Sequence, residues 1–221
     1  MAAAAALTDA IATLDLRFGA RTVVSATGAT ERTDTRRFLT GTAFDRVSGG
    51  IVPGSPLALV GEGTCGKVTM ALRTVAGAQA EGAMALWVDG ARSFDPLAAH
   101  RVGVDLRRVV VIRARTGAEI LLVAGTALRS EGFRLVVVDL GPSFAQVASI
   151  DGLAPILPQV RGSTSALVVV ADAPALRVAI PTFAFERADL ERRHGRTVGW
   201  SFAVRRTGDP VDEAALLEVA V

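Results

Sequence analysis

Several residue types that specify common kinds of protein site are scarce or missing in this sequence of 221 residues. One cysteine excludes an internal disulfide, and two histidines in no ligand-like spacing with it give no sign of a metal site. Tyrosine is missing, and aromatic residues make up only 5% of the chain. No apolar run reaches the roughly 18 residues of a membrane helix, and no basic segment precedes the alanine-rich N-terminus. We therefore expect a cytoplasmic protein with neither a membrane span nor a signal peptide.

Lysine is the scarcest charged residue. Of 24 basic residues 23 are Arg, and Lys67 is the only Lys. The formal net charge of +2 does not by itself indicate nucleic-acid binding. We interpret the arginine doublets as solvated surface charge, with phosphate or DNA contact as the alternative. These doublets are Arg36-Arg37, Arg107-Arg108, Arg192-Arg193 and Arg205-Arg206.

The single lysine lies in a glycine-rich stretch, PLALVGEGTCGKVTM at residues 56–70. Gly61, four residues, Gly66 and Lys67 nearly match a phosphate-binding loop (Walker A). In such a loop the backbone N–H groups and a helix N-terminus hold phosphate, and the lysine reaches the outer phosphates. The predicted nucleotide site is Gly61, Glu62, Gly63, Thr64, Cys65, Gly66, Lys67, Val68 and Thr69.

Two features of the loop predict weakened binding. The residue after Lys67 should be Ser or Thr, because that hydroxyl holds Mg²⁺, but Val68 stands there. Thr69 comes one residue later, which rotates its hydroxyl by roughly 100° around a helix. Glu62 adds a negative charge beside the phosphates. Binding of ATP or ADP is therefore expected to be weak or absent, without Mg²⁺. We interpret Cys65 as a small filler residue, and the alternative is a reactive thiol.

After the loop, short apolar segments alternate with helical patterns. Strands that are apolar on both faces and alternate with helices predict an α/β fold with a mainly parallel sheet, covered by helices on both faces. Successive strands from about residue 166 predict an antiparallel C-terminal edge, and residues 209–221 a short terminal helix. The earlier strands are predicted at 56–60, 83–89, 108–114 and 133–139, and the helices at 67–81, 95–103 and 117–130.

One of these strands, RLVVVD, ends in Asp139. A carboxylate at the carboxyl end of a core strand is where phosphate-loop proteins position Mg²⁺, usually through water (Walker B). Together with the loop, Asp139 predicts a nucleotide site, and the alternative is a worn-out loop with a strand-end cap.

Residues 1–33 are predicted to form an N-terminal helix-strand arm before a core of residues 34–221. An apolar stripe at helical spacing runs along residues 7–18, and RTVVSA at 21–26 reads as a short strand. The stripe needs a surface to bury against, either its own core or another subunit. Its residues are Leu7, Ile11, Leu14 and Phe18.

The chain resembles RecA, the bacterial recombinase. The most specific matches are DPLAAHRVGVDLRRVVV with TGAEI after it, and LVVVDL, within a likeness that covers about residues 7–141. The resemblance implies a RecA-like P-loop core, a nucleotide site, and an arm that packs on a neighbouring subunit.

The departures from RecA affect its catalytic parts. Aligned on Asp89, the catalytic glutamate of RecA falls at Ala91, and the tyrosine that stacks on adenine falls at Ala98. Two connections that are long DNA-binding loops in RecA are short here, and its C-terminal domain is not expected. The chain is therefore predicted not to be an active ATPase. The alternative is a slow ATP-hydrolysing, DNA-binding recombinase, whose base would be Asp89, Glu62 or Asp95.

Short RecA-like proteins with these losses resemble the ImuA family, accessory proteins of bacterial SOS mutagenesis and translesion synthesis. That resemblance implies binding to RecA or to an ImuB-type mutasome protein, or self-association through the arm. Direct DNA binding is expected to be weak if it occurs at all.

Overall fold

The computed structural model describes residues 36–144, 147, 150–172, 180–193, 196–207 and 214–220. Arg37–Val221 forms one compact unit. Its elements are α3 (Phe44–Ser48), β1 (Pro56–Val60), α4 (Lys67–Ala80), β2 (Ala85–Asp89), α5 (Pro96–Arg101), η1 (Leu106–Arg108), β3 (Val109–Ile112), α6 (Gly117–Ser130), β4 (Leu135–Asp139), η2 (Pro142–Phe144), α7 (Ile150–Leu153), α8 (Leu157–Arg161), β5 (Ala166–Ala171), β6 (Thr182–Arg193), β7 (Arg196–Thr207) and β8 (Ala214–Ala220). None of these described helices is long and apolar enough to span a bilayer.

The predicted arm falls outside this description. Residues 1–33, with the stripe Leu7, Ile11, Leu14 and Phe18, lie outside the described residues.

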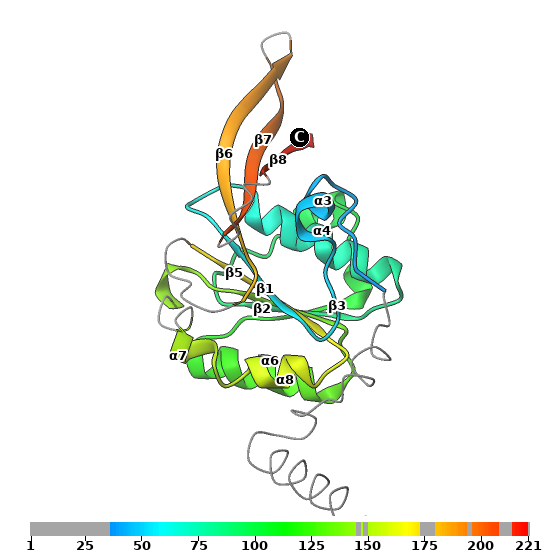
Figure 1. Cartoon of the computed structure of the whole chain (residues 1–221), viewed down its shortest axis with the longest axis vertical. Helices are drawn as coiled ribbons and strands as arrows, with labels where there is room; N and C mark the ends of the chain where they lie inside the picture. Colours follow the sequence, from blue (N-terminus) through cyan, green and yellow to red (C-terminus); the bar gives the residue numbers. More distant parts are fainter. Residues whose placement is uncertain are drawn as a thin grey trace, which may run out of the picture. The chain divides into compact units, whose positions relative to one another are not determined.

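The described strands form one mixed sheet in the order β3-β2-β4-β5-β1-β6-β7-β8. Neighbours from β3 to β6 run parallel, whereas β7 is antiparallel to β6 and β8 to β7. Figure 1 shows helices on both sides of the sheet, α3 and α4 on one side and α6 and α8 on the other. The predicted α/β fold, a mainly parallel sheet with both faces covered and an antiparallel C-terminal edge, is confirmed.

The central strands are apolar on both faces because each face meets a helix layer. Every residue of β2, β4 and β5 is buried. Along β2 the side chains alternate between two cores: Trp87 lies in the core that includes α4, and Leu86 and Val88 lie in the core that includes α6. This two-sided burial is the reason the strands read as continuous apolar runs.

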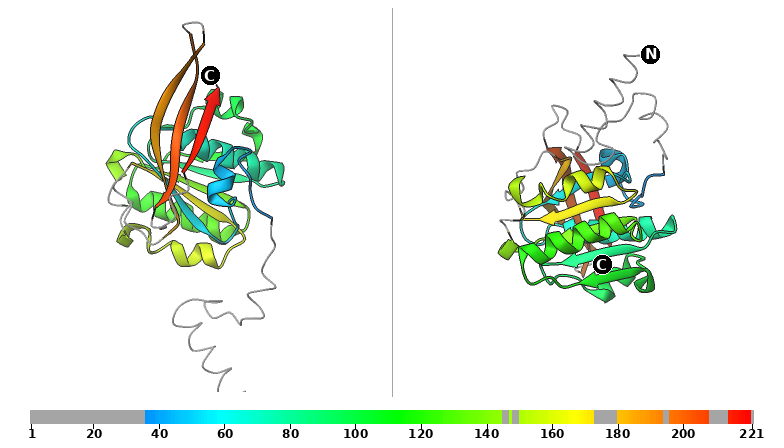
Figure 2. Two further views of the ribbon diagram at one scale, coloured as in Figure 1. Left: turned by 45° about the horizontal axis from the view of Figure 1, so that its top comes forward. Right: turned by 90° about the horizontal axis from the view of Figure 1, so that it is seen from below.

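The C-terminal half corrects two predictions. The predicted helix over 209–221 is wrong, because Ala214–Ala220 is strand β8, paired with β7 (Figure 2). Its Ala, Leu and Glu residues favour a helix, but the open edge of β7 supplies a complete row of hydrogen-bonding partners. The strand at 166–171 was expected in the antiparallel edge, yet β5 is parallel and lies between β4 and β1.

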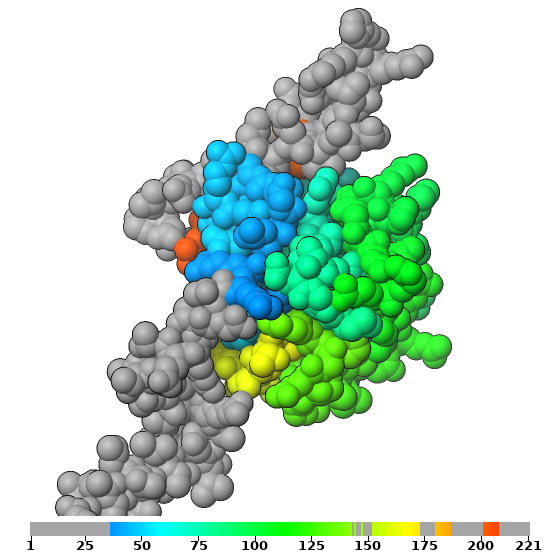
Figure 3. Space-filling model, turned by 90° about the vertical axis from the view of Figure 1, so that its right-hand side faces the viewer, coloured from blue at the N-terminus to red at the C-terminus, as the bar shows by residue number. Residues whose placement is uncertain are grey.

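The segment before β1 packs on α4. The backbones of Phe38 and Ile51 pair with each other at 2.9 and 3.0 Å, and both side chains are fully buried. Asp45 accepts from the N–H groups of Thr40 and Gly41, each at 2.9 Å. Figure 3 shows this segment, in blue, beside the turquoise part of the chain to which α4 belongs. The segment thus braces the helix that follows the glycine-rich loop.

Candidate functional site

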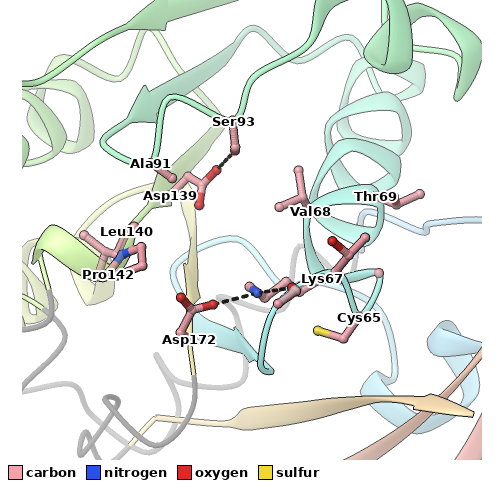
Figure 4. Close-up of a pocket in the computed structure, with 14 residues that line it drawn as sticks. Cys65, Lys67, Val68, Thr69, Ala91, Ser93, Asp139, Leu140, Pro142 and Asp172 are labelled. Carbon is pink, nitrogen blue, oxygen red and sulfur yellow. Dashed lines mark hydrogen bonds and ion pairs between the residues drawn. The ribbon is translucent and has the colours of Figure 1, made fainter.

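The glycine-rich loop lies at the carboxyl edge of the parallel strands, between β1 and α4. β5 lies beside β1, with Ala171 opposite Val60, and β4 lies beside β5, with Asp139 opposite Val170. Asp139 and Asp172 therefore reach the same edge from two neighbouring strands. Together with the loop they line a pocket of about 290 Å³ (Figure 4).

The backbone of the loop keeps the shape of an anion cradle. Gly66 has φ 91° and stands immediately before the first residue of α4. A Cβ on Gly61 would lie 2.4 Å from Cys65 Sγ and 2.5 Å from the carbonyl oxygen of Phe185, so only glycine fits there. The first turn of α4 lines the pocket, and the N–H groups of a first turn have no acceptor within their own helix.

Lys67 is buried beneath the loop, with 7% of its surface exposed. Its Nζ donates to the carbonyl oxygens of Gly61 at 2.7 Å and Gly63 at 2.8 Å. Its third contact is an ion pair with Asp172 Oδ1 at 2.8 Å. Oxygens of the chain itself therefore surround the ammonium: two carbonyls accept hydrogen bonds from it and one carboxylate pairs with its charge.

Of the other polar residues of the loop, Thr64 and Cys65 line the pocket, and Glu62 is not among the described residues that line it. Glu62 and Thr64 are exposed to solvent. Cys65 is buried, 2% exposed, which argues against the reactive-thiol alternative because such thiols need access.

The side of the pocket on which the resemblance to RecA implies Mg²⁺ carries an alkyl group. In Figure 4, Val68 lies on the side of α4 that faces Ser93 and Asp139, and Thr69 lies on the far side of the helix. The hydroxyl of Thr69 therefore does not replace the oxygen that Val68 lacks.

Asp139 ends β4 in an almost fully buried position, 2% exposed. Its Oδ2 accepts a hydrogen bond from the Ser93 hydroxyl, and the N–H of Ser93 donates to Asp89 Oδ1 at 2.9 Å. Burial raises the pKa of Asp139 to about 6; the Ser93 hydrogen bond acts against this rise, and the charge of Asp89 adds to it. Two carboxylates of adjacent strands are thus joined through one serine.

The described lining of the pocket holds neither a carboxylate at the expected position of the base nor one of the three carboxylates considered as its replacement. Ala91 lines it with a methyl group. Asp89 is fully buried, with its Oδ2 3.6 Å from Arg113 Nε, and Asp95 caps the N-terminus of α5. The described residues that line the pocket do not include Asp89, Asp95 or Glu62.

Members of three arginine doublets make contacts within the described part of the chain. Arg37 donates to the carbonyl oxygen of Gly49 at 2.5 Å. Arg107 pairs with Asp105, and Arg205 pairs with Glu186. Arg108 donates to a backbone carbonyl of α4 at 3.1 Å. These contacts favour a structural reading of the doublets over phosphate binding.

Most of the chain matches one known protein family. Residues 5–163 match the RecA N-terminal domain. The chain belongs to the RecA family. Protein RecA of Frankia alni is 32% identical over 150 residues, 66% of this chain and 43% of that protein. Protein RecA of Leifsonia xyli subsp. xyli is 31% identical over 150 residues, 66% and 42% of the two chains. Protein RecA of Allorhizobium ampelinum is 33% identical over 104 residues, 47% and 29%. This RecA-family chain spans less than half the length of these relatives.

The resemblance to RecA implies ATP and Mg²⁺, and the residues of the pocket fit the two unequally. Mg²⁺ does not fit: Val68 offers no oxygen, Asp139 is engaged by Ser93, and no three His, Cys, Asp or Glu residues in the described part of the chain could hold a metal ion. Phosphate fits the loop backbone, but Lys67 already donates to two carbonyls of the loop and is paired with Asp172. The backbone of the loop is suited to an anion, whereas the side chains around it do not suit Mg²⁺.

Two polar residues of the RecA-like pocket, Asp172 and Ser93, were not predicted from the sequence. Asp172 follows the apolar run SALVVVA as Asp139 follows RLVVV, so the same strand-end signal could have identified it. Ser93 carries no such signal, because its role depends on the pairing of β2 with β4.

Proposed function

We propose that this RecA-family chain is a non-hydrolysing accessory protein of the bacterial DNA-damage response, acting in SOS mutagenesis and translesion synthesis. The observation that supports it best is the side-chain chemistry of the pocket. Ala91 and Val68 present alkyl groups where the RecA resemblance implies a general base and a hydroxyl on Mg²⁺. Hydrolysis then has neither a group to take the proton of water nor a cation to neutralise the transferred phosphate.

The charge of the pocket also disfavours a nucleotide. Of the described residues that line it, Lys67 is the positive one, and Asp139 and Asp172 carry carboxylates. With a pKa of about 6, Asp139 is mostly ionised at neutral pH. Two negative charges against one positive charge repel a triphosphate, which supports weak or lost binding of ATP and ADP.

The work of such a protein would be done through protein contacts. The stripe of the N-terminal arm is the proposed contact surface, and RecA, an ImuB-type mutasome protein or a second copy of this chain is the proposed partner. The stripe supports this role because a one-sided apolar helix needs a second surface to bury against. The role in SOS mutagenesis rests on the resemblance to the ImuA family.

Replacing Ile11 and Leu14 by Asp is expected to abolish pull-down of RecA by the full chain. Two charges within the apolar stripe would have to be buried at the contact, which is unfavourable by several kcal/mol. The measurement is recovery of RecA on the immobilised chain, with circular dichroism to verify the fold.

A matched control places the same two charges off the stripe, at Ala12 and Thr13, about 100° or more around the predicted helix from Ile11 or Leu14. Ala12→Asp with Thr13→Asp is expected to keep wild-type recovery. Equal recovery by both double variants would refute the role of the stripe.

The purified chain is expected to hydrolyse no ATP above background, with or without single-stranded DNA. The reason is the lack of a base and of a Mg²⁺ ligand in the pocket. Phosphate release at saturating ATP is the measurement, with Lys67→Ala as the reference for contaminating activity. Turnover by the wild type that disappears in Lys67→Ala would instead establish the slow-recombinase alternative.

A further inference from the structure

The carboxylate of Asp172 occupies the direction in which Lys67 would otherwise meet a phosphate. Two N–H donors of Lys67 Nζ are directed back into the loop, to Gly61 and Gly63. The third contact of Nζ, the ion pair with Asp172 at 2.8 Å, lies across the pocket (Figure 4). An outer phosphate would have to compete with this carboxylate for the same positive charge, because two N–H groups of the ammonium are bound to the loop backbone.

The strand order explains why this contact forms. β5 is the direct neighbour of β1, and the N–H of Gly61 donates to the carbonyl oxygen of Ala171 at 3.3 Å. The residue after Ala171 is therefore held next to the residue after Val60, where the loop begins. Asp172 is thus held beside the cradle by the pairing of β5 with β1, and its carboxylate carries the same sign of charge as a phosphate oxygen.

We propose that Asp172 is an internal competitor for the phosphate cradle, and that its side chain, rather than the shape of the loop, prevents nucleotide binding. The contact is an ion pair, and a phosphate oxygen would pair with the same ammonium. A phosphate has to displace the carboxylate and then bind beside its negative charge. The inference rests on the proposed function in taking a nucleotide as the ligand that the loop excludes.

The two partners differ in exposure in a way that permits displacement. The side chain of Asp172 is 36% exposed and that of Lys67 only 9%. The lysine is held by the loop, whereas the aspartate approaches from the solvent side. Removing the charge of Asp172 therefore opens the cradle without disturbing its buried half.

Titration calorimetry of the full chain with ADP and with ATPγS, each with Mg²⁺, tests the inference. Asp172→Asn is expected to bind either nucleotide about tenfold more tightly than the wild type, or more, because the competing negative charge is gone. Adding Lys67→Ala to Asp172→Asn is expected to abolish this gain, since the freed ammonium is its source.

Asp105→Asn is the matched control. Asp105 is also an aspartate in an ion pair, with Arg107, and its side chain is 33% exposed, but it lies outside this pocket. Asp105→Asn should bind nucleotide as the wild type does. Equal affinity of Asp172→Asn and the wild type would overturn the inference, as would a gain that survives Lys67→Ala or that Asp105→Asn reproduces.

A second readout needs no ligand, and it uses Lys67 as the only lysine of the chain. Incorporation of ¹⁵N-lysine gives a single side-chain ammonium signal, whose protons exchange slowly with water while the ammonium is buried and paired. Asp172→Asn and Asp172→Ala are both expected to accelerate this exchange and to shift the signal. An unchanged signal in folded variants would overturn the inference. The pull-down of RecA is measured separately, so either proposal can fail while the other stands.

Discussion

A Gly77→Ala variant is expected to lose about 3 kcal/mol or more of its free energy of unfolding, although alanine is the better helix former by about 1 kcal/mol. Gly77 lies in α4, and a Cβ on it would lie 1.9 Å from the carbonyl oxygen of Leu39 and 2.8 Å from its carbonyl carbon. Both atoms are backbone, so no rotamer change can relieve the clash. Either α4 or the segment before β1 has to move.

Gly125→Ala is the matched control, because Gly125 also lies inside a long helix, α6. Its Cβ would meet Gln159 Oε1 at 2.9 Å and Arg129 Nη1 at 3.4 Å, both at the ends of flexible side chains. We expect a change within about 1 kcal/mol of zero, since the side chains can yield and helix propensity improves. Urea unfolding of both variants measures the difference, and equal losses would show that the approach of Leu39 to α4 does not constrain the fold.

The Gly77 prediction bears on the site because α4 carries Lys67 at its first position. Phe38 and Ile51 anchor the segment on either side of Leu39 by their backbone pairing and their full burial. A shift of α4 away from this segment would displace the first turn that lines the pocket. The close contact between the backbones of Gly77 and Leu39 therefore keeps the first turn of α4 in place beside β1.

The elements around the site could be predicted because local patterns specify them. The helix predicted over 117–130 is α6, Gly117–Ser130, whose start is set by Thr116 accepting from the N–H of Glu119 at 3.1 Å. The helix predicted from Lys67 is α4, and the strand predicted at 56–60 is β1. Capping, helical periodicity and doubly apolar runs are properties of neighbouring residues, so the sequence displays them directly.

The pairing of Lys67 with Asp172 could not be predicted in the same way. It depends on β5 lying beside β1, which is more than a hundred residues away in sequence. The succession of short strand-like segments after residue 166 predicted an antiparallel edge instead. The order of strands is set by crossovers and by packing of both helix layers, which no local pattern reports. The error over β8 has the same origin, because helix-forming residues there pair with the edge of β7.

Asp139→Asn is expected to raise the free energy of unfolding by about 2 kcal/mol at pH 8 and by much less below pH 4. In the folded chain burial raises the pKa of Asp139 to about 6, from an ordinary value of 3.8. The folded state therefore binds the proton more tightly than the unfolded state does. The stabilisation that the folded state gains from binding this proton is complete below about pH 4 and is lost as the pH rises through 6. A shift of about two pKa units corresponds to roughly 3 kcal/mol, from which the loss of a charged acceptor for Ser93 subtracts.

The measurement is urea unfolding of the wild type and Asp139→Asn from pH 4 to 8. The difference between the two chains is the informative quantity, because the other titrating groups are shared. It should grow between pH 4 and 6 and then become constant. Two curves that stay parallel over this range would show that the buried carboxylate carries no such penalty.

Ser93→Ala is expected to lower the free energy of unfolding at pH 8, whereas Asp139→Asn raises it. The Ser93 hydroxyl donates to the ionised form of Asp139 and acts against the rise of its pKa. Without this hydroxyl the pKa of Asp139 should rise above 6. The free energy of unfolding should then be about 1–3 kcal/mol below that of the wild type at pH 8, which is the usual effect of leaving a buried charged acceptor unpaired. Added MgCl₂ should not restore the loss, since Val68 supplies no oxygen beside Asp139. Restoration by MgCl₂ would mean that this carboxylate still binds the cation, and the non-hydrolysing proposal would then lose its main support.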